Sequence, residues 1–140
     1  MSTNRFALIY GIVFLVIGVA GFIPGITTPH THPEMAAESG LGLLFGLFPV
    51  NLLHNIVHAL FGIWGLFAAR SLGGARAYFK AVAIIYAVLG VMGLIPGLRT
   101  TFGLIPLYSN DIWLHFLLAG VAAYFGFVRR EEPTIASAAH

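Results

Sequence analysis

The chain has 140 residues, of which 59% are hydrophobic and 9% are charged, with a mean hydropathy of +0.91. About a quarter of the residues of a soluble domain are charged, so this composition excludes an ordinary soluble domain and predicts a membrane protein. The formal charge is only +2, and there is no cysteine, which excludes disulfides and thiol chemistry.

Four apolar stretches are long enough to cross a bilayer as helices, which takes about 20 residues each. The first lacks a small-residue cleavage site, so we expect a first span and not a removed signal peptide. The prediction is a single all-α domain over 1–140, a polytopic four-helix membrane protein with spans at about 6–23, 50–69, 78–95 and 111–128.

The connections differ in length and character. Residues 25–49 form a long loop that is polar at first and then apolar, LGLLFGLFP, and this second part is expected to lie in the membrane interface or fold back onto the bundle. Ser71–Ala77 is a short connection containing Gly73-Gly74, so spans two and three should be antiparallel neighbours. The tail after Val128 is expected to be mobile.

Basic residues predict the orientation. Only Arg99 lies on one side of this topology, and all other Lys and Arg lie on the opposite side: Arg5, Arg70, Arg76, Lys80, Arg129 and Arg130. The positive-inside rule then places both termini in the cytoplasm.

The two halves of the chain, about 1–70 and 71–130, resemble each other. VIGVAGFIPG at 16–25 aligns with VLGVMGLIPG at 88–97 with seven of ten positions identical, and FGLFP at 45–49 aligns with FGLIP at 102–106. The pattern predicts two tandem helical hairpins of the same orientation, related by a pseudo-two-fold axis along the membrane normal. Small residues at equivalent positions should let the helices approach closely, namely Gly18, Gly21, Gly62, Gly65, Gly90, Gly93, Ala119 and Ala122.

Two motifs carry a resemblance to a known family. Asn55, His58, Gly62 and Gly65 form N-x-x-H-x-x-x-G-x-x-G in the second span, and Asp-x-Trp-Leu-His opens the fourth at 111–115. Both resemble a family of bacterial four-helix integral membrane proteins of unknown function. In that family an Asn follows the Asp of the second motif, where this chain has Ile112. The resemblance implies the fold and no activity.

Polar side chains inside the second and fourth spans are the candidate site. His58 and His115 occupy equivalent positions of the two halves, with Asn55 beside His58. One hypothesis is that they bind a haem, a chlorophyll-type pigment or a metal ion, with Gly62 leaving room for a flat macrocycle. The alternative is that each imidazole makes an interhelical hydrogen bond, and then no cofactor is expected.

Two groups of histidines are candidate metal ligands. His54 and His58 share a helix face at i and i+4, although two ligands are too few for a closed site. His30 and His32, with acidic residues nearby, lie on the long loop. The simpler interpretation is that His54 and its neighbour Asn51 are hydrated near the interface and that the loop histidines face solvent.

Polar residues around the fourth span have simpler expected roles. Arg99 and Asp111 are placed to form a salt bridge across the second loop, and Asn110 or Asp111 is placed to cap the helix. Trp113, Tyr108 and Trp64 are typical of membrane-interface or packing aromatics.

The sequence contains no acidic residue in the middle of a span, no nucleotide-binding loop and no nucleophile–base motif. We therefore expect no enzyme and no nucleic-acid partner. The preferred hypothesis is a non-catalytic accessory or scaffold subunit that contacts lipid and other membrane subunits or a second copy of itself. A cofactor-binding protein and a small-solute permease are the alternatives. The expected location is a bacterial plasma membrane or a thylakoid-type internal membrane.

Overall fold

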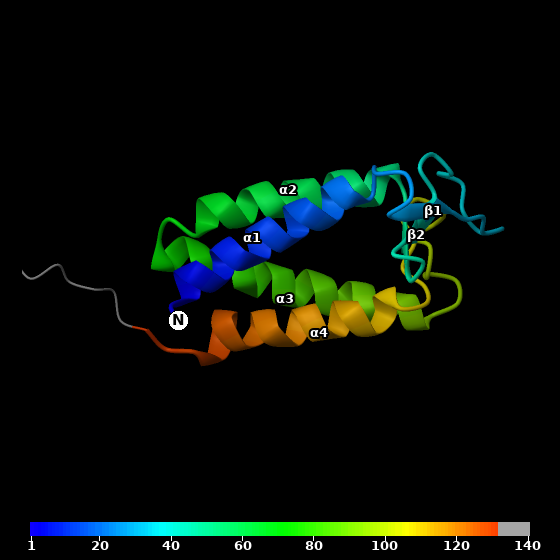
Figure 1. Cartoon of the computed structure of the whole chain (residues 1–140). Coiled ribbons are helices and arrows are strands. Elements are labelled where there is room, and N and C mark those ends of the chain that lie inside the picture. The colour runs from blue at the N-terminus through cyan, green and yellow to red at the C-terminus, as the bar shows by residue number, and fades with distance from the viewer. Residues whose placement is uncertain (132–140) are drawn as a thin grey trace, which may run out of the picture.

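The computed structural model describes residues 1–131, which form four α-helices with a small antiparallel sheet at one end (Figure 1). The tail beyond these residues, predicted to be mobile, lies outside the described part of the chain. The helices are α1 Thr3–Ala20, α2 Leu52–Ala68, α3 Leu72–Leu94 and α4 Asp111–Ala123, which continues as the π-helix η1 Tyr124–Val128; the strands are β1 Thr27–Pro29, β2 Gly42–Leu44 and β3 Phe48–Val50.

The sheet corrects the all-α prediction. Its strand order is β1-β2-β3, and β2 and β3 come from the apolar segment that was expected to lie in the interface or fold back onto the bundle. Pro49 is tolerated because β3 is an edge strand and needs to pair on one side only. Strands of three residues leave little periodicity in a sequence, so the sequence pattern does not predict this sheet.

Several helix boundaries differ from the predicted spans. The first helix ends at Ala20, three residues before the predicted end. Most of the predicted connection Ser71–Ala77 is helical, because α3 already begins at Leu72. Ser71 caps this helix, its Oγ accepting a hydrogen bond of 3.0 Å from the Gly74 N–H, and the two glycines form the first turn.

Three of the helical segments are long and apolar enough to cross a membrane: Thr3–Ala20, Leu72–Leu94 and Asp111–Val128. The fourth, α2, has 17 residues, which corresponds to about 25 Å at the helical rise. Most of the protein's large exposed side chains are apolar and lie on these helices. Length and composition are thus compatible with a membrane protein.

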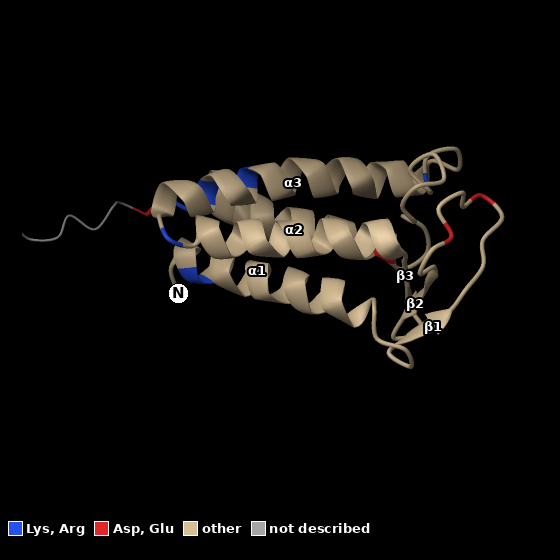
Figure 2. Cartoon of the chain, turned by 90° about the horizontal axis from the view of Figure 1, so that it is seen from above, with Lys and Arg blue, Asp and Glu red and all other residues tan. Residues whose placement is uncertain are grey.

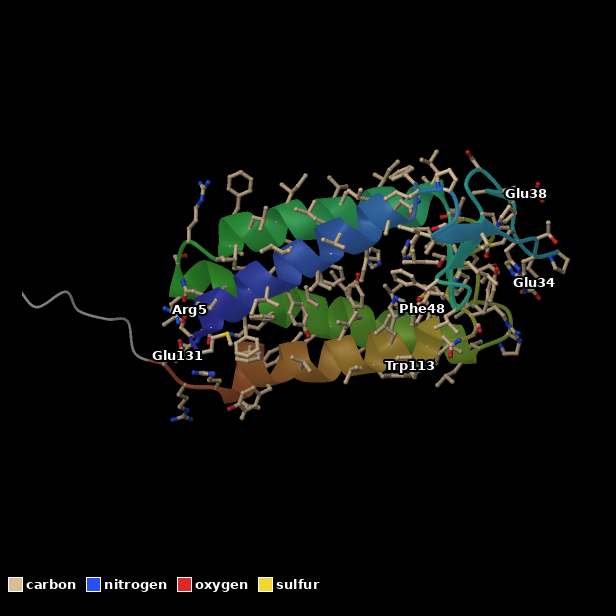
Figure 3. The ribbon with its side chains drawn as sticks, in the orientation of Figure 1. Arg5, Glu34, Glu38, Phe48, Trp113 and Glu131 are labelled. Atoms are coloured by element: carbon tan, nitrogen blue, oxygen red, sulfur yellow. The ribbon has the colours of Figure 1, made fainter. Side chains whose placement is uncertain are left out.

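The helices pack in pairs. α1 packs mainly against α2, and α3 mainly against α4, with the two pairs side by side (Figure 1). Buried aromatic rings fill the space between the pairs, namely Phe14, Tyr78, Phe79 and Tyr86. Arg5 and Glu131 lie at the end of the bundle that holds the N-terminus, and Glu34 and Glu38 at the opposite end, on the loop that extends beyond the sheet (Figure 3). Lys and Arg gather at the end that holds the N-terminus (Figure 2), which we call the basic end. We call the opposite end, which holds the sheet, the sheet end.

The two FGLxP segments form similar turns at the sheet end, although Thr101, which begins the second turn, also has a positive φ of 49° and Leu44, which begins the first, does not. Phe45 and Gly46 have φ of 54° and 70°, and Phe102 and Gly103 have φ of 58° and 84°. In each turn the leucine that follows donates its N–H to the carbonyl of the residue before the phenylalanine, at 3.0 Å and 3.2 Å. Positive φ at both central residues defines a type I′ turn, which strongly favours Asn-Gly or Gly-Gly. A phenylalanine in the first position is therefore strained.

Candidate functional site

A buried asparagine joins three segments at the sheet end. Asn51 is fully buried, and its Nδ2 donates to the carbonyls of Ala37 at 3.0 Å and Leu104 at 2.7 Å. Its Oδ1 accepts from the His54 N–H at 2.9 Å and so caps α2. The expectation that Asn51 and His54 are hydrated is wrong, because the two loops close over the start of α2 and leave His54 only 5% exposed.

The two histidines of α2 stack on each other. The ring centroids of His54 and His58 are 4.1 Å apart with an angle of 29° between the planes. Nitrogen lone pairs lie in the ring planes, so two nearly parallel rings do not direct them to one ion between them. His54 Nδ1 instead lies 3.3 Å from Asn55 Oδ1, which is a hydrogen bond. In this arrangement His54 and His58 form a packed polar contact.

Asn55 faces the first helix. Its side chain fills the space beside Gly21, where an added Cβ would overlap the amide. Its Nδ2 is buried without a hydrogen-bond partner in residues 1–131. Gly21 therefore serves to admit this asparagine between α1 and α2.

Tyr86 contacts both His115 and His58. The His115 ring stacks on Tyr86 with centroids 5.0 Å apart and 21° between the planes, and the His58 ring lies edge-on to the same tyrosine at 6.5 Å. His115 Nδ1 lies 2.6 Å from the carbonyl oxygen of Asp111, to which it donates. Tyr86 was not among the predicted site residues, because a tyrosine in an apolar span is typical of a residue that packs between helices. Its position opposite both imidazoles could not be seen without the fold.

The three helical histidines line one small cavity. His54, His58 and His115 surround a volume of about 60 Å³ together with Tyr86. A space of this size holds a few water molecules. It does not accommodate a haem or chlorophyll macrocycle between the helices.

Asp111 is buried at the start of α4. It is 3% exposed, and its Oδ2 has no hydrogen-bond partner within the described chain. The expected salt bridge with Arg99 is absent: the ion pair found among residues 1–131 joins Arg129 and Glu131.

The expected capping of the fourth helix is also wrong. Asn110 precedes α4 but makes no side-chain cap bond. Its amide donates to the Leu47 carbonyl at 3.2 Å and accepts from Trp113 Nε1 at 3.0 Å. Trp113 lies beside Phe48 of β3, with ring centroids 5.9 Å apart (Figure 3). Asn110 and Trp113 therefore attach the hairpin formed by β2 and β3 to α4.

The loop histidines contact a tyrosine. His32 stacks on Tyr108 with centroids 4.2 Å apart, whereas the rings of His30 and His32 are 6.5 Å apart. Burial, and then the nearby Asp111 carboxyl, raise the pKa of Tyr108. Across residues 1–131 no three His, Asp or Glu side chains are grouped to hold a metal ion.

Small residues lie where the helices approach most closely. An added Cβ would meet the opposite helix or its flanking loop within 3.0 Å at Gly62, Gly65, Gly18, Gly90 and Gly93, while Ala119 and Ala122 are buried. Gly11, which was not predicted, is part of the same contact, since an added Cβ at Gly65 would lie 2.7 Å from its Cα. Gly11 lies outside the segments that align between the two halves, and the alignment therefore gave no signal for it.

These features define a class of protein: a bundle of four apolar helices, most of them long enough to cross a membrane, closed at one end by loops with a buried polar cluster. The family described as domain of unknown function (DUF4383) matches residues 4–128, and the chain belongs to it. The match is consistent with the uncharacterised family that the two motifs resemble. No curated protein and no solved structure matches the chain.

Proposed function

We propose that this protein is a non-catalytic subunit of a membrane complex, crossing a bacterial membrane with all four helices. Exposed apolar side chains along each helix support the membrane location, since a soluble bundle covers its surface with charge. Such side chains include Val16, Leu60, Ile84, Val88, Leu117 and Phe127. In this proposal α2 spans the bilayer beside α1, although it is shorter than the other spans.

The proposed orientation places both termini in the cytoplasm. Lys and Arg gather at the basic end of the bundle (Figure 2), and the positive-inside rule assigns that end to the cytoplasmic face. The sheet end, with the two FGLxP turns, then faces outward. The shared turn supports the proposal that residues 1–70 and 71–130 are tandem repeats.

The observation that carries the assembly proposal is the pair of strained phenylalanines. Phe45 and Phe102 are 64% and 76% exposed, so neither ring contributes much to the core of this chain. The left-handed conformation costs roughly 1–2 kcal/mol for a residue with a Cβ. A strained backbone that displays an apolar ring is explained if the ring contacts something outside the chain, and we infer another membrane subunit or a second copy.

Purification in a mild detergent tests this proposal. The wild-type chain is expected to migrate as an assembly with itself or with a co-purifying membrane protein, and Phe102→Asn should release the monomer. Phe67→Asn is the matched control, because Phe67 is also exposed, at 56%, but lies near the basic end. A monomeric wild-type chain without a co-purifying protein would contradict the proposal.

The cofactor alternative has less support. The cavity beside His58 and His115 is too small for a macrocycle, so a pigment would have to bind outside the bundle or displace helices. A visible spectrum of the purified protein decides between the two: a Soret or chlorophyll band would replace the subunit hypothesis with the cofactor hypothesis.

A further inference from the structure

A second cavity lies between α1 and α4, below the β2–β3 hairpin. Its volume is about 130 Å³, and its wall includes Val13 and Ile17 of α1, Leu114 and Leu118 of α4, and Phe48 of the hairpin. His54, His58 and Asp111 add a polar part to this otherwise apolar wall. We call this space the lateral cavity.

The lateral cavity lies on a loosely packed seam. α1 packs mainly on α2, and α4 mainly on α3, so α1 and α4 contact each other little. Toward the basic end, the Tyr10 hydroxyl donates to the Leu118 carbonyl at 3.2 Å and joins the two helices. The hairpin covers the sheet end. Val13, which lines the cavity, is 43% exposed, so this part of the wall borders the surface that would face lipid.

Two polar groups in the wall of the lateral cavity lack hydrogen-bond partners among the residues that the structure describes. Asp111 and His58 are 3% and 7% exposed, and neither Asp111 Oδ2 nor His58 Nδ1 has a hydrogen-bond partner among the residues that the structure describes. Buried polar groups in proteins are nearly always paired, so a cluster with two unpaired groups beside a cavity points to a ligand.

The chemistry of the wall selects the head group of that ligand. A carboxyl group and an imidazole each donate or accept according to their protonation and tautomer. A hydroxyl has one hydrogen to donate and lone pairs to accept, so it complements the pair when at least one of the two groups is a donor, and it brings no charge into this buried space. An ammonium head cannot accept a hydrogen bond, and a carboxylate head cannot donate one. At about 130 Å³ the cavity suits a small head and leaves an apolar tail in the lipid.

We propose that the lateral cavity binds the hydroxyl head of a neutral, membrane-soluble amphiphile that enters from the bilayer between α1 and α4. Asp111 and the α2 histidines hold the hydroxyl, and the apolar residues of α1 and α4 hold the first carbons of the tail. Phe45 lies in the wall of this cavity, whereas Phe102 does not, and the assembly test is made on Phe102 and not on a cavity residue.

The test uses the full chain in phosphatidylcholine nanodiscs, whose lipid carries no hydroxyl in its head group. The probes are 1-decanol, decane, decylamine and decanoate, with binding followed by native mass spectrometry and by the thermal unfolding midpoint. One 1-decanol per chain is expected to bind saturably and raise the midpoint, and the other three probes are expected to bind at least tenfold more weakly.

Variants locate the site. Leu114→Trp should fill the cavity, and Asp111→Leu should remove its acid; each is expected to weaken 1-decanol binding at least tenfold. Leu117→Trp is the matched control, because Leu117 lies on the same helix but is 55% exposed and does not line the cavity. If Asp111→Leu fails to fold, Leu114→Trp still decides the outcome. Equal binding of decane, decylamine or decanoate, or equal 1-decanol binding in Leu114→Trp and wild type, would overturn the proposal.

Discussion

The Asn51 side chain donates a hydrogen bond of 2.7 Å to the carbonyl oxygen of Leu104, 53 positions further along the chain. The same amide donates to Ala37 and caps α2, so one residue joins both long loops to the second helix. One buried side chain therefore attaches both loops that cover the polar cluster to the start of α2.

Asn51→Ala is expected to destabilise the protein by roughly 2–3 kcal/mol, because it removes the cap of α2 and the hydrogen bonds to the Ala37 and Leu104 carbonyls. Thermal unfolding in detergent measures the change. Asn110→Ala is the control, since that amide also donates to a loop carbonyl but in an exposed hydrogen bond, and its loss should matter by less than about 1 kcal/mol. Equal effects of the two substitutions would mean that the Asn51 contacts do not hold the loops.

Gly11→Ala is expected to destabilise the protein by roughly 1–3 kcal/mol, because an added Cβ would lie 2.8 Å from the Leu66 nitrogen on α2. Gly120→Ala makes a matched comparison, since Gly120 is also helical but has no atom within 4 Å of an added Cβ. That substitution should be neutral or stabilise by up to about 1 kcal/mol through helix propensity. Unfolding midpoints that fall equally for both variants would contradict the close contact of α1 and α2.

Phe102→Asn is expected to raise the stability of the isolated monomer by about 1 kcal/mol, because asparagine tolerates positive φ far better than phenylalanine. The control is Phe22→Asn, a similarly exposed phenylalanine outside the positive-φ residues, which should bring no gain. Together with the expected loss of assembly, a gain in monomer stability would show that Phe102 is retained for contact and not for folding. A loss of monomer stability would refute that interpretation.

The ionisation of Glu131 is expected to make the stability of the basic end depend on pH. Burial raises its pKa, but hydrogen bonds from Thr3 and the charge of Arg129 outweigh this and lower the pKa of Glu131 below its ordinary value of 4.5. A lowered pKa means that the ionised form is favoured by folding, so this contribution is present above pH 4.5 and is lost as the pH falls through the folded-state pKa. The stability of Glu131→Gln, followed by unfolding at a series of pH values, should depend less on pH in that range. An unchanged profile would rule out this contribution.

Much of the fold could be predicted from the sequence, because lipid as a solvent leaves few choices. Apolar stretches of span length must be helical to satisfy their own backbone, and small residues such as Gly62 and Gly65 must face other helices for those to pack closely. The four helices follow from these local requirements. The exact helix ends do not follow from these requirements. The end of α1 at Ala20 and the cap of α3 at Ser71 depend on which carbonyls and side chains meet.

The polar cluster was decided by the tertiary structure alone. Nothing local to Asn51 tells that Ala37 and Leu104 will lie beside it, and Asp111 next to a helix start looks like a surface cap until the loops close over it. The hydrogen-bond partner of a buried polar group is set by where distant segments end in space, whereas the preference for lipid over water is a property of each segment by itself. For that reason the sequence of this protein determined a membrane-compatible helical bundle, and only the folded chain determined which of its polar groups are paired and which are left facing a cavity.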